Sequence, residues 1–190
     1  MFQYNIELKK VEEYLKMYED TINAKRNPEN KEKLKAICEK VKDRYKEYLN
    51  NKNCLETIVQ DAECCKLQKQ LNDCYEKNER VVRELNEIIK KQKLEIQHLC
   101  PLCELNRYSE KDHYLPKKQF PEYSIFIPNI IPACNDCNKK KSERITDNDC
   151  NRLFLNAYFD KFPTTEILKA NVDFSEEVPY AKFYLSKENM

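Results

Sequence analysis

The chain has 190 residues, a size that suits one ordinary domain or a small domain with a substantial extension. Charged residues make up 35% and hydrophobic residues 41%, which excludes a disordered chain, and no apolar stretch reaches the ~18 residues that a membrane span needs. The net charge of +1 excludes binding of polyanions along the whole chain, so any affinity for nucleic acid must be local.

The N-terminus does not open a secretory signal peptide, and we expect a cytoplasmic protein. In that reducing compartment the ten cysteines should stay free or bind metal instead of forming disulfides. Six of them are expected to be ordinary thiols, mostly on helix faces: Cys38, Cys54, Cys64, Cys65, Cys74 and Cys150.

Residues 1–99 are predicted to be helical. Apolar residues at steps of three and four predict one amphipathic helix from Tyr4 to Ile22 and a second from Leu34 to Tyr48. Between them, Asn27-Pro28 breaks the first pattern, and Pro28 suits the first turn of the next helix.

A long third helix is expected from Leu71 to Leu99, with heptad spacing. Asn78 and Gln92 within this seam are similar to the polar positions that set register in coiled coils. We therefore expect residues 1–99 to form a helical hairpin, a bundle or a self-associating coiled coil that binds a partner. The alternative is that these helices only form a core.

The composition changes at Cys100, where prolines and aromatic residues become frequent. Residues 123–127 fit a strand or a loop, residues 135–145 could start a helix, and residues 149–162 have helical apolar spacing. A last extended stretch covers residues 181–185. The predicted fold class is α+β, mostly α, with a helical region at 1–99 and a second domain at 100–190.

Two CxxC pairs frame the middle of the second region: Cys100 with Cys103, and Cys134 with Cys137. Zinc prefers four tetrahedral ligands, and two such turns each present two thiolates to one ion. Because four cysteines fill the coordination sphere, we expect a structural zinc ion with no open position for water.

The residues between and beside these pairs suit phosphodiester hydrolysis. Neutral imidazole, here His113, can activate water near pH 7. The carboxylate of Asp112 and the amide oxygen of Asn138 are oxygen donors that suit Mg²⁺ or Mn²⁺. Asn129 can hold the backbone around His113 by hydrogen bonding.

This pattern resembles the HNH, or ββα-metal, endonucleases with a zinc-binding frame. The resemblance rests on Asp112-His113-Tyr114-Leu115-Pro116-Lys117, Pro128-Asn129 and Cys134-Asn135-Asp136-Cys137-Asn138-Lys139-Lys140-Lys141, and covers roughly residues 98–145. It implies that His113 is the general base, that Asp112 and Asn138 bind the catalytic metal, that Asn129 orients the histidine loop, and that the four cysteines bind zinc. An asparagine stands at the third motif position, a common variation that keeps an oxygen ligand.

The chain departs from the family in two places. Related chains often carry a histidine just before the Tyr158-Phe159-Asp160 stretch, where this one has Asn156-Ala157, and the end at Met190 is short for the family. The second histidine, His98, is expected to have a surface or packing role.

The resemblance implies metal-dependent cleavage of DNA, with basic side chains holding the nucleic-acid backbone. The candidates are Lys117, Lys118, Lys139, Lys140, Lys141 and Arg144. Small HNH proteins with helical extensions resemble effectors of bacterial anti-phage systems, often controlled by a partner ATPase, with mobile-element and restriction enzymes as rival contexts. The alternative function is a non-catalytic zinc module on a helical scaffold that binds nucleic acid or protein.

Overall fold

The computed structural model describes residues 3–161, 168–175 and 178–185. Its contacts divide the chain after Asp160 into two compact units, residues 1–160 and 161–190, which are described separately. The predicted α+β, mostly helical class is confirmed. No helix in the described ranges is long and apolar enough to cross a membrane.

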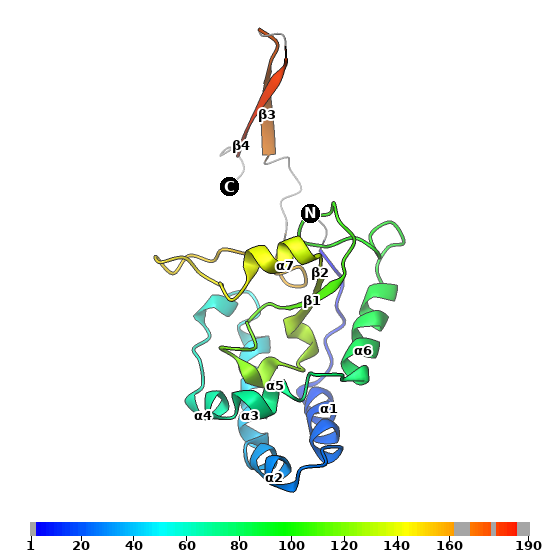
Figure 1. The fold of residues 1–190 in the computed structure, drawn as a ribbon, viewed down its shortest axis with the longest axis vertical. Helices are drawn as coiled ribbons and strands as arrows, with labels where there is room; N and C mark the ends of the chain where they lie inside the picture. The colour runs from blue at the N-terminus through cyan, green and yellow to red at the C-terminus, as the bar shows by residue number, and fades with distance from the viewer. Residues whose placement is uncertain (1–2, 162–167, 176–177, 186–190) are drawn as a thin grey trace. The chain divides into compact units, whose positions relative to one another are not determined.

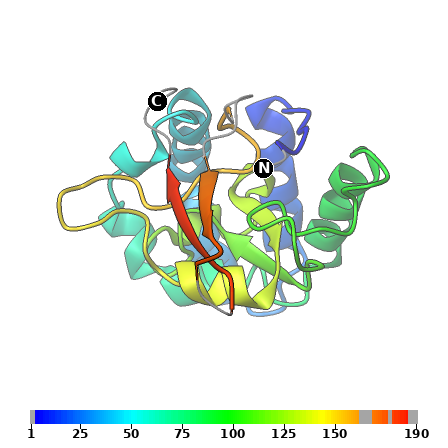
Figure 2. The same ribbon diagram turned by 90° about the horizontal axis from the view of Figure 1, so that it is seen from above.

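In the described part of unit 1, six α-helices precede the first strand: α1 (Val11–Asn23), α2 (Pro28–Ala36), α3 (Cys38–Asn50), α4 (Ala62–Lys66), α5 (Gln68–Asn72) and α6 (Glu79–Lys90). As the Asn-Pro pair predicts, α2 begins at Pro28 with Asn27 as its N-cap, whose side chain accepts a hydrogen bond from the Asn30 N–H. Figures 1 and 2 show α1 and α6 on one side of unit 1, and α3 and α4 on the other.

Three helix predictions were wrong in extent. The helix predicted from Leu34 to Tyr48 is interrupted at Ile37, between α2 and α3. Residues 4–10 are extended, and α1 begins only at Val11. The continuous helix over residues 71–99 is broken, because the Asn78 side chain accepts from the N–H groups of Arg80 and Val81 and so caps α6.

Gln92, the other polar residue of the predicted seam, lies just beyond α6 and is buried. Its side chain accepts from the Asn5 N–H at 2.8 Å and donates to the Asn5 carbonyl oxygen at 2.8 Å. It therefore joins the extended N-terminal segment to α6, and within one chain it has no role in coiled-coil register.

After the helices, β1 (Glu110–His113) pairs antiparallel with β2 (Ile130–Ala133), and α7 (Asn135–Lys141) follows and packs on β1. Residues 123–127 form no strand; two 3₁₀ turns, Pro121–Tyr123 and Ile127–Asn129, lie in this connection instead, and a third, Leu55–Thr57, precedes α4. The helix predicted over 149–162 is wrong for its described part, residues 149–161, where turns and an isolated bridge occur.

The helices and the ββα segment share one hydrophobic core. The Tyr45 ring of α3 stacks on Phe126, with ring centroids 4.2 Å apart, and Tyr48 meets Tyr123 edge-on at 5.1 Å. Aromatic pairs of this kind add to the free energy of area burial. Contacts therefore do not divide the chain at residue 100, where its composition changes.

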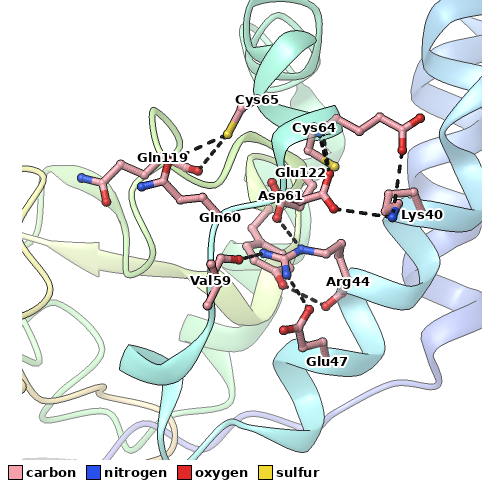
Figure 3. A network of polar contacts seen from close by, with 12 residues as sticks. Lys40, Arg44, Glu47, Val59, Gln60, Asp61, Cys64, Cys65, Gln119 and Glu122 are labelled. Atoms are coloured by element: carbon pink, nitrogen blue, oxygen red, sulfur yellow. Dashed lines mark hydrogen bonds and ion pairs between the residues drawn. The ribbon is translucent and has the colours of Figure 1, made fainter.

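A buried ion pair makes the same connection (Figure 3). Arg44 of α3 donates from Nε to Glu122 Oε1 at 2.7 Å, and from its terminal nitrogens to the Val59 carbonyl oxygen and to Glu47. The side chain of Arg44 is 8% exposed and that of Glu122 is fully buried. Glu122 lies between His113 and Asn129 in the chain, so α3 anchors the loop that builds the candidate site.

Unit 2 contains a hairpin of β3 (Leu168–Asp173) and β4 (Tyr180–Leu185). The extended stretch predicted at 181–185 is confirmed, and its pairing partner is β3. The register places Ala170 opposite Phe183 and Val172 opposite Ala181, so one face of the hairpin is apolar. Phe183 is 67% exposed.

Candidate active site and metal centre

The four cysteines of the two CxxC pairs meet in space. The Sγ atoms of Cys100, Cys103, Cys134 and Cys137 all lie within 4.8 Å of one another. Cys103 Sγ and Cys134 Sγ are 3.8 Å apart, close to the ~3.8 Å edge of a tetrahedron built on Zn–S bonds of ~2.3 Å. This donor set fits a metal ion such as zinc.

The same cluster starts α7. Cys134 is the N-cap of this helix, and its Sγ accepts the Cys137 N–H at 3.4 Å and an Asn106 amide N–H at 3.8 Å. Thiolate charge at a helix N-terminus is favourable, because the unpaired N–H groups there carry partial positive charge. A metal bound by the cysteines would therefore also fix where α7 begins.

A cavity of about 690 Å³ lies beside β1 and α7. Asp112 and His113 of β1 and Asn138 of α7 all line it. The structure thus brings together the three residues expected to act on the substrate and the catalytic metal, as the ββα arrangement requires. Both views show α7 beside the β1–β2 hairpin (Figures 1 and 2).

The His113 ring is held in one orientation. Its Nε2 lies 2.8 Å from the carbonyl oxygen of Ser124. Burial lowers the pKa of His113 to about 4, although the Ser124 contact opposes this shift. The imidazole is therefore neutral near pH 7, and since a carbonyl can only accept, Nε2 carries the proton. Nδ1 is left as the basic nitrogen.

Only one of the two carboxylate oxygens of Asp112 has a hydrogen-bond partner among the described residues. Its Oδ1 accepts from the Lys141 ammonium at 3.1 Å, while Oδ2 is buried and has no hydrogen-bond partner among the described residues. Burial raises the pKa of the Asp112 carboxyl and Lys141 opposes this shift. Oδ2 is the kind of unsatisfied oxygen donor that fits a hard divalent cation.

Asn129 binds the backbone two residues after His113. Its side chain accepts from the Leu115 N–H at 2.8 Å and donates to the Leu115 carbonyl oxygen at 3.0 Å. Asn129 is fully buried, so these bonds satisfy backbone groups that water cannot reach. The contacts agree with its expected role in orienting the histidine loop.

The expected backbone-binding residues fall into two groups. Lys117 and Lys118 line the cavity, where they pair with Glu76 and Glu143. Lys139, Lys140 and Arg144 are exposed. Lys141 differs from them, because its ammonium is buried between Asp112 and the His113 carbonyl oxygen and cannot reach a phosphate on the surface.

Sequence reasoning missed the contribution of the helical half to the cavity. Gln68, Asn72 and Tyr75 line it, and the Tyr75 ring meets the His113 ring edge-on. Ser124, whose backbone carbonyl oxygen accepts a hydrogen bond from His113 Nε2, was missed as well. No sequence pattern marks these residues, since their role depends on how α5 packs on the loop after His113. His98, as expected, is on the surface.

Comparison with known proteins gives two partial similarities. The chain is 29% identical over 85 residues to protein ea31 of Escherichia phage lambda, a match that covers 44% of this chain and 26% of that protein. It is 40% identical over 42 residues to the Septu protein PtuB of Bacillus thuringiensis, covering 22% of this chain and 16% of PtuB. The chain therefore spans about a quarter of the first relative and a sixth of the second. No protein-family model and no solved structure matches it.

Proposed function

We propose that this protein is a metal-dependent endonuclease that hydrolyses phosphodiester bonds in DNA. The observation that carries the proposal is a neutral imidazole, oriented through Nε2, in the same cavity as a buried carboxylate with one unpaired oxygen. A general base and an oxygen-ligated cation are the two groups that this reaction needs. The resemblance of the surrounding residues to HNH endonucleases supports the same assignment.

In this mechanism Asp112 and Asn138 would hold Mg²⁺ or Mn²⁺. The ion, when bound, polarises the phosphate and stabilises the leaving 3′ oxygen. His113 would take the proton of the attacking water at Nδ1 as the new P–O bond forms and the bond to the 3′ oxygen breaks. The leaving oxygen would take a proton from solvent water, which gives 5′-phosphate and 3′-hydroxyl ends. Asn129 keeps the His113 loop in place, and Lys117, Lys118, Lys139, Lys140 and Arg144 hold the DNA backbone. A zinc ion held by the four cysteines would take no part in the chemistry.

The similarity to the Septu protein PtuB supports the anti-phage role that the HNH resemblance implies. We propose that the chain is the nuclease component of such a system, and that its helical half contacts a partner, either a regulatory ATPase or a second copy. Cleavage of both DNA strands would require two copies, because one site cuts one strand. Isolation of the native complex and identification of its subunits would test the role; recovery of the chain alone, active and unregulated, would contradict it.

One observation favours the alternative, a non-catalytic zinc module that binds nucleic acid or protein. The Lys141 ammonium pairs with Asp112 Oδ1 at 3.1 Å, and both side chains are buried. Under the proposed function Lys141 shares the carboxylate with the metal. Under the alternative it is a permanent structural partner, and no divalent ion binds beside it.

Nicking of supercoiled plasmid by the zinc-loaded full chain separates the two functions. We expect nicking that requires Mg²⁺ or Mn²⁺, its loss in His113→Ala, and its retention in His98→Ala, which changes the exposed histidine. General-base catalysis is worth ~10²–10⁴ in rate, so the loss should be of that size. Zinc content and far-UV circular dichroism should be equal in all three proteins. Undiminished cutting by His113→Ala would exclude His113 as the base.

A further inference from the structure

One wall of the cavity, which the sequence did not predict, comes from the helical half of the chain. α5 and the turn after it supply three lining residues, Gln68, Asn72 and Tyr75. These residues lie about forty positions before His113 in the chain, outside the segment that resembles HNH endonucleases. They therefore line the same cavity as Asp112 and His113.

Tyr75 contacts the His113 ring directly. The two ring centroids are 4.6 Å apart and the ring planes are inclined by 75°, an edge-to-face arrangement. The Lys117 ammonium lies 4.8 Å from the centroid of the Tyr75 ring, and Lys117 is also paired with Glu76. Tyr75 therefore contacts both the expected base and a cation expected to bind phosphate.

The second restraint on His113 leads to the same segment. His113 Nε2 binds the Ser124 carbonyl oxygen, and the Ser124 hydroxyl donates to the Leu71 carbonyl oxygen of α5 at 2.8 Å. Ser124 is buried, so water does not compete for these bonds. Residues 71–75 thus restrain the imidazole through one hydrogen-bonded path and one ring contact.

We infer that Tyr75 is a positioning residue for His113, and that α5 and Tyr75 complete the nuclease site. The inference rests on the proposed function. The Tyr75 ring blocks rotation of the imidazole about its Cβ–Cγ bond, the motion that would exchange Nδ1 with Cδ2 and Nε2 with Cε1. It thereby keeps Nδ1, the unprotonated nitrogen, directed toward the cavity.

Steady-state nicking by the zinc-loaded full chain tests this role with Tyr75→Leu and Tyr75→Phe. A misplaced catalytic group costs on the order of 10²-fold in rate, so we expect Tyr75→Leu to lower kcat by about 10- to 100-fold with little change in KM. Tyr75→Phe keeps the ring and should stay within about twofold of the original kcat. Tyr108→Leu is the matched control, because Tyr108 is also half-buried but does not line the cavity.

A second measurement needs no activity. The chain has two histidines, so the imidazole C–H signals in proton NMR are few, and His98→Gln assigns them. Ring currents of Tyr75 should displace the His113 signals in the original protein and in Tyr75→Phe, and the displacement should vanish in Tyr75→Leu. Unchanged signals in Tyr75→Leu would overturn the ring contact.

The two proposals fail in different ways. An original protein that binds DNA but does not cut it under any divalent ion overturns the proposed function. An original protein that cuts, together with a Tyr75→Leu variant of unchanged kcat, overturns the positioning role alone. Rescue of kcat by phenylalanine but not leucine supports the role, since a general loss of folding would also change zinc content and the dichroism signal.

Discussion

Replacement of Arg44 by methionine tests whether α3 and the loop before Asn129 are held together by a buried charge. Methionine keeps the aliphatic bulk of the arginine stem but removes the guanidinium. Glu122 Oε1 then loses its ion-pair partner inside the core, while Oε2 already has no hydrogen-bond partner among the described residues. An unpaired buried charge of this kind costs about 3–5 kcal/mol.

The stability lost in Arg44→Met should depend on pH, and the burial of Glu122 determines the direction of that dependence. Burial raises the pKa of the Glu122 carboxyl, and the Arg44 charge opposes that shift. Without Arg44 the folded-state pKa rises further above the unfolded value, so the folded variant binds an extra proton at mildly acidic pH. The contribution of Glu122 to the stability of Arg44→Met is therefore greatest at low pH and is lost as pH rises through the folded pKa of Glu122. The deficit relative to the original protein should grow from pH 5 to pH 8.

Urea unfolding followed by far-UV circular dichroism measures these free energies. We expect Arg44→Met to lose about 3–5 kcal/mol at pH 7.5, and Arg44→Met combined with Glu122→Met to recover most of that loss, because no charge is then left buried. Arg80→Met is the control: Arg80 and Asp20 form an exposed pair, with side chains 40% and 43% exposed, and its loss should cost under about 1 kcal/mol. A cost below about 1 kcal/mol for Arg44→Met, or no recovery in the double variant, would refute the reasoning.

Two further predictions concern the tyrosines and the cysteines. Burial raises the pKa of Tyr4 to about 12 and that of Tyr45 well above its ordinary value. The folded state therefore resists an ionisation that the unfolded state undergoes near pH ~10. The contribution of these tyrosines to the free energy of unfolding should be full below pH ~10 and fall above it. Absorbance of tyrosinate at 295 nm should rise together with loss of the dichroism signal, and ionisation of all twelve tyrosines near pH 10 with the fold intact would contradict this. Metal analysis should find one zinc per chain, lost in Cys103→Ala and kept in Cys150→Ala, which changes an exposed thiol outside the cluster; zinc retained by Cys103→Ala would show that the cluster is not its site.

Local signals predicted much of the fold. The Asn27-Pro28 start of α2 and the strand at residues 181–185 follow from turn chemistry and alternation, which act over a few residues. The bounds of α1 and α6 did not follow. Residues 4–10 have helical spacing, yet the Tyr4 hydroxyl donates to the Ile96 carbonyl oxygen, a contact ninety-two residues away that holds the segment extended. Tertiary contacts of that range leave no trace in a short window of sequence.

The candidate site shows the same division. Residue type and spacing predicted which residues lie together: the CxxC pairs form one cluster, and Asp112, His113 and Asn138 line one cavity. What could not be predicted is which groups hold them. Lys141 looked like one more lysine of a basic run, but the helical turn from Asn138 directs it onto Asp112. Tyr75 looked like one more apolar residue of a helical stripe, and only the packing of α5 places its ring on His113.

The stacking of Tyr45 on Phe126 has a consequence for how this chain could arise and change. A ββα segment with its own core could be transferred to another protein and still fold. This segment would instead expose the aromatic rings that α3 covers here. During synthesis, a nascent chain that has emerged only as far as residue 99 has helices whose apolar faces are still exposed to solvent. A chain that lacked α3 and α5 would lose the cover of these rings and, with α5, part of the wall of the cavity beside His113.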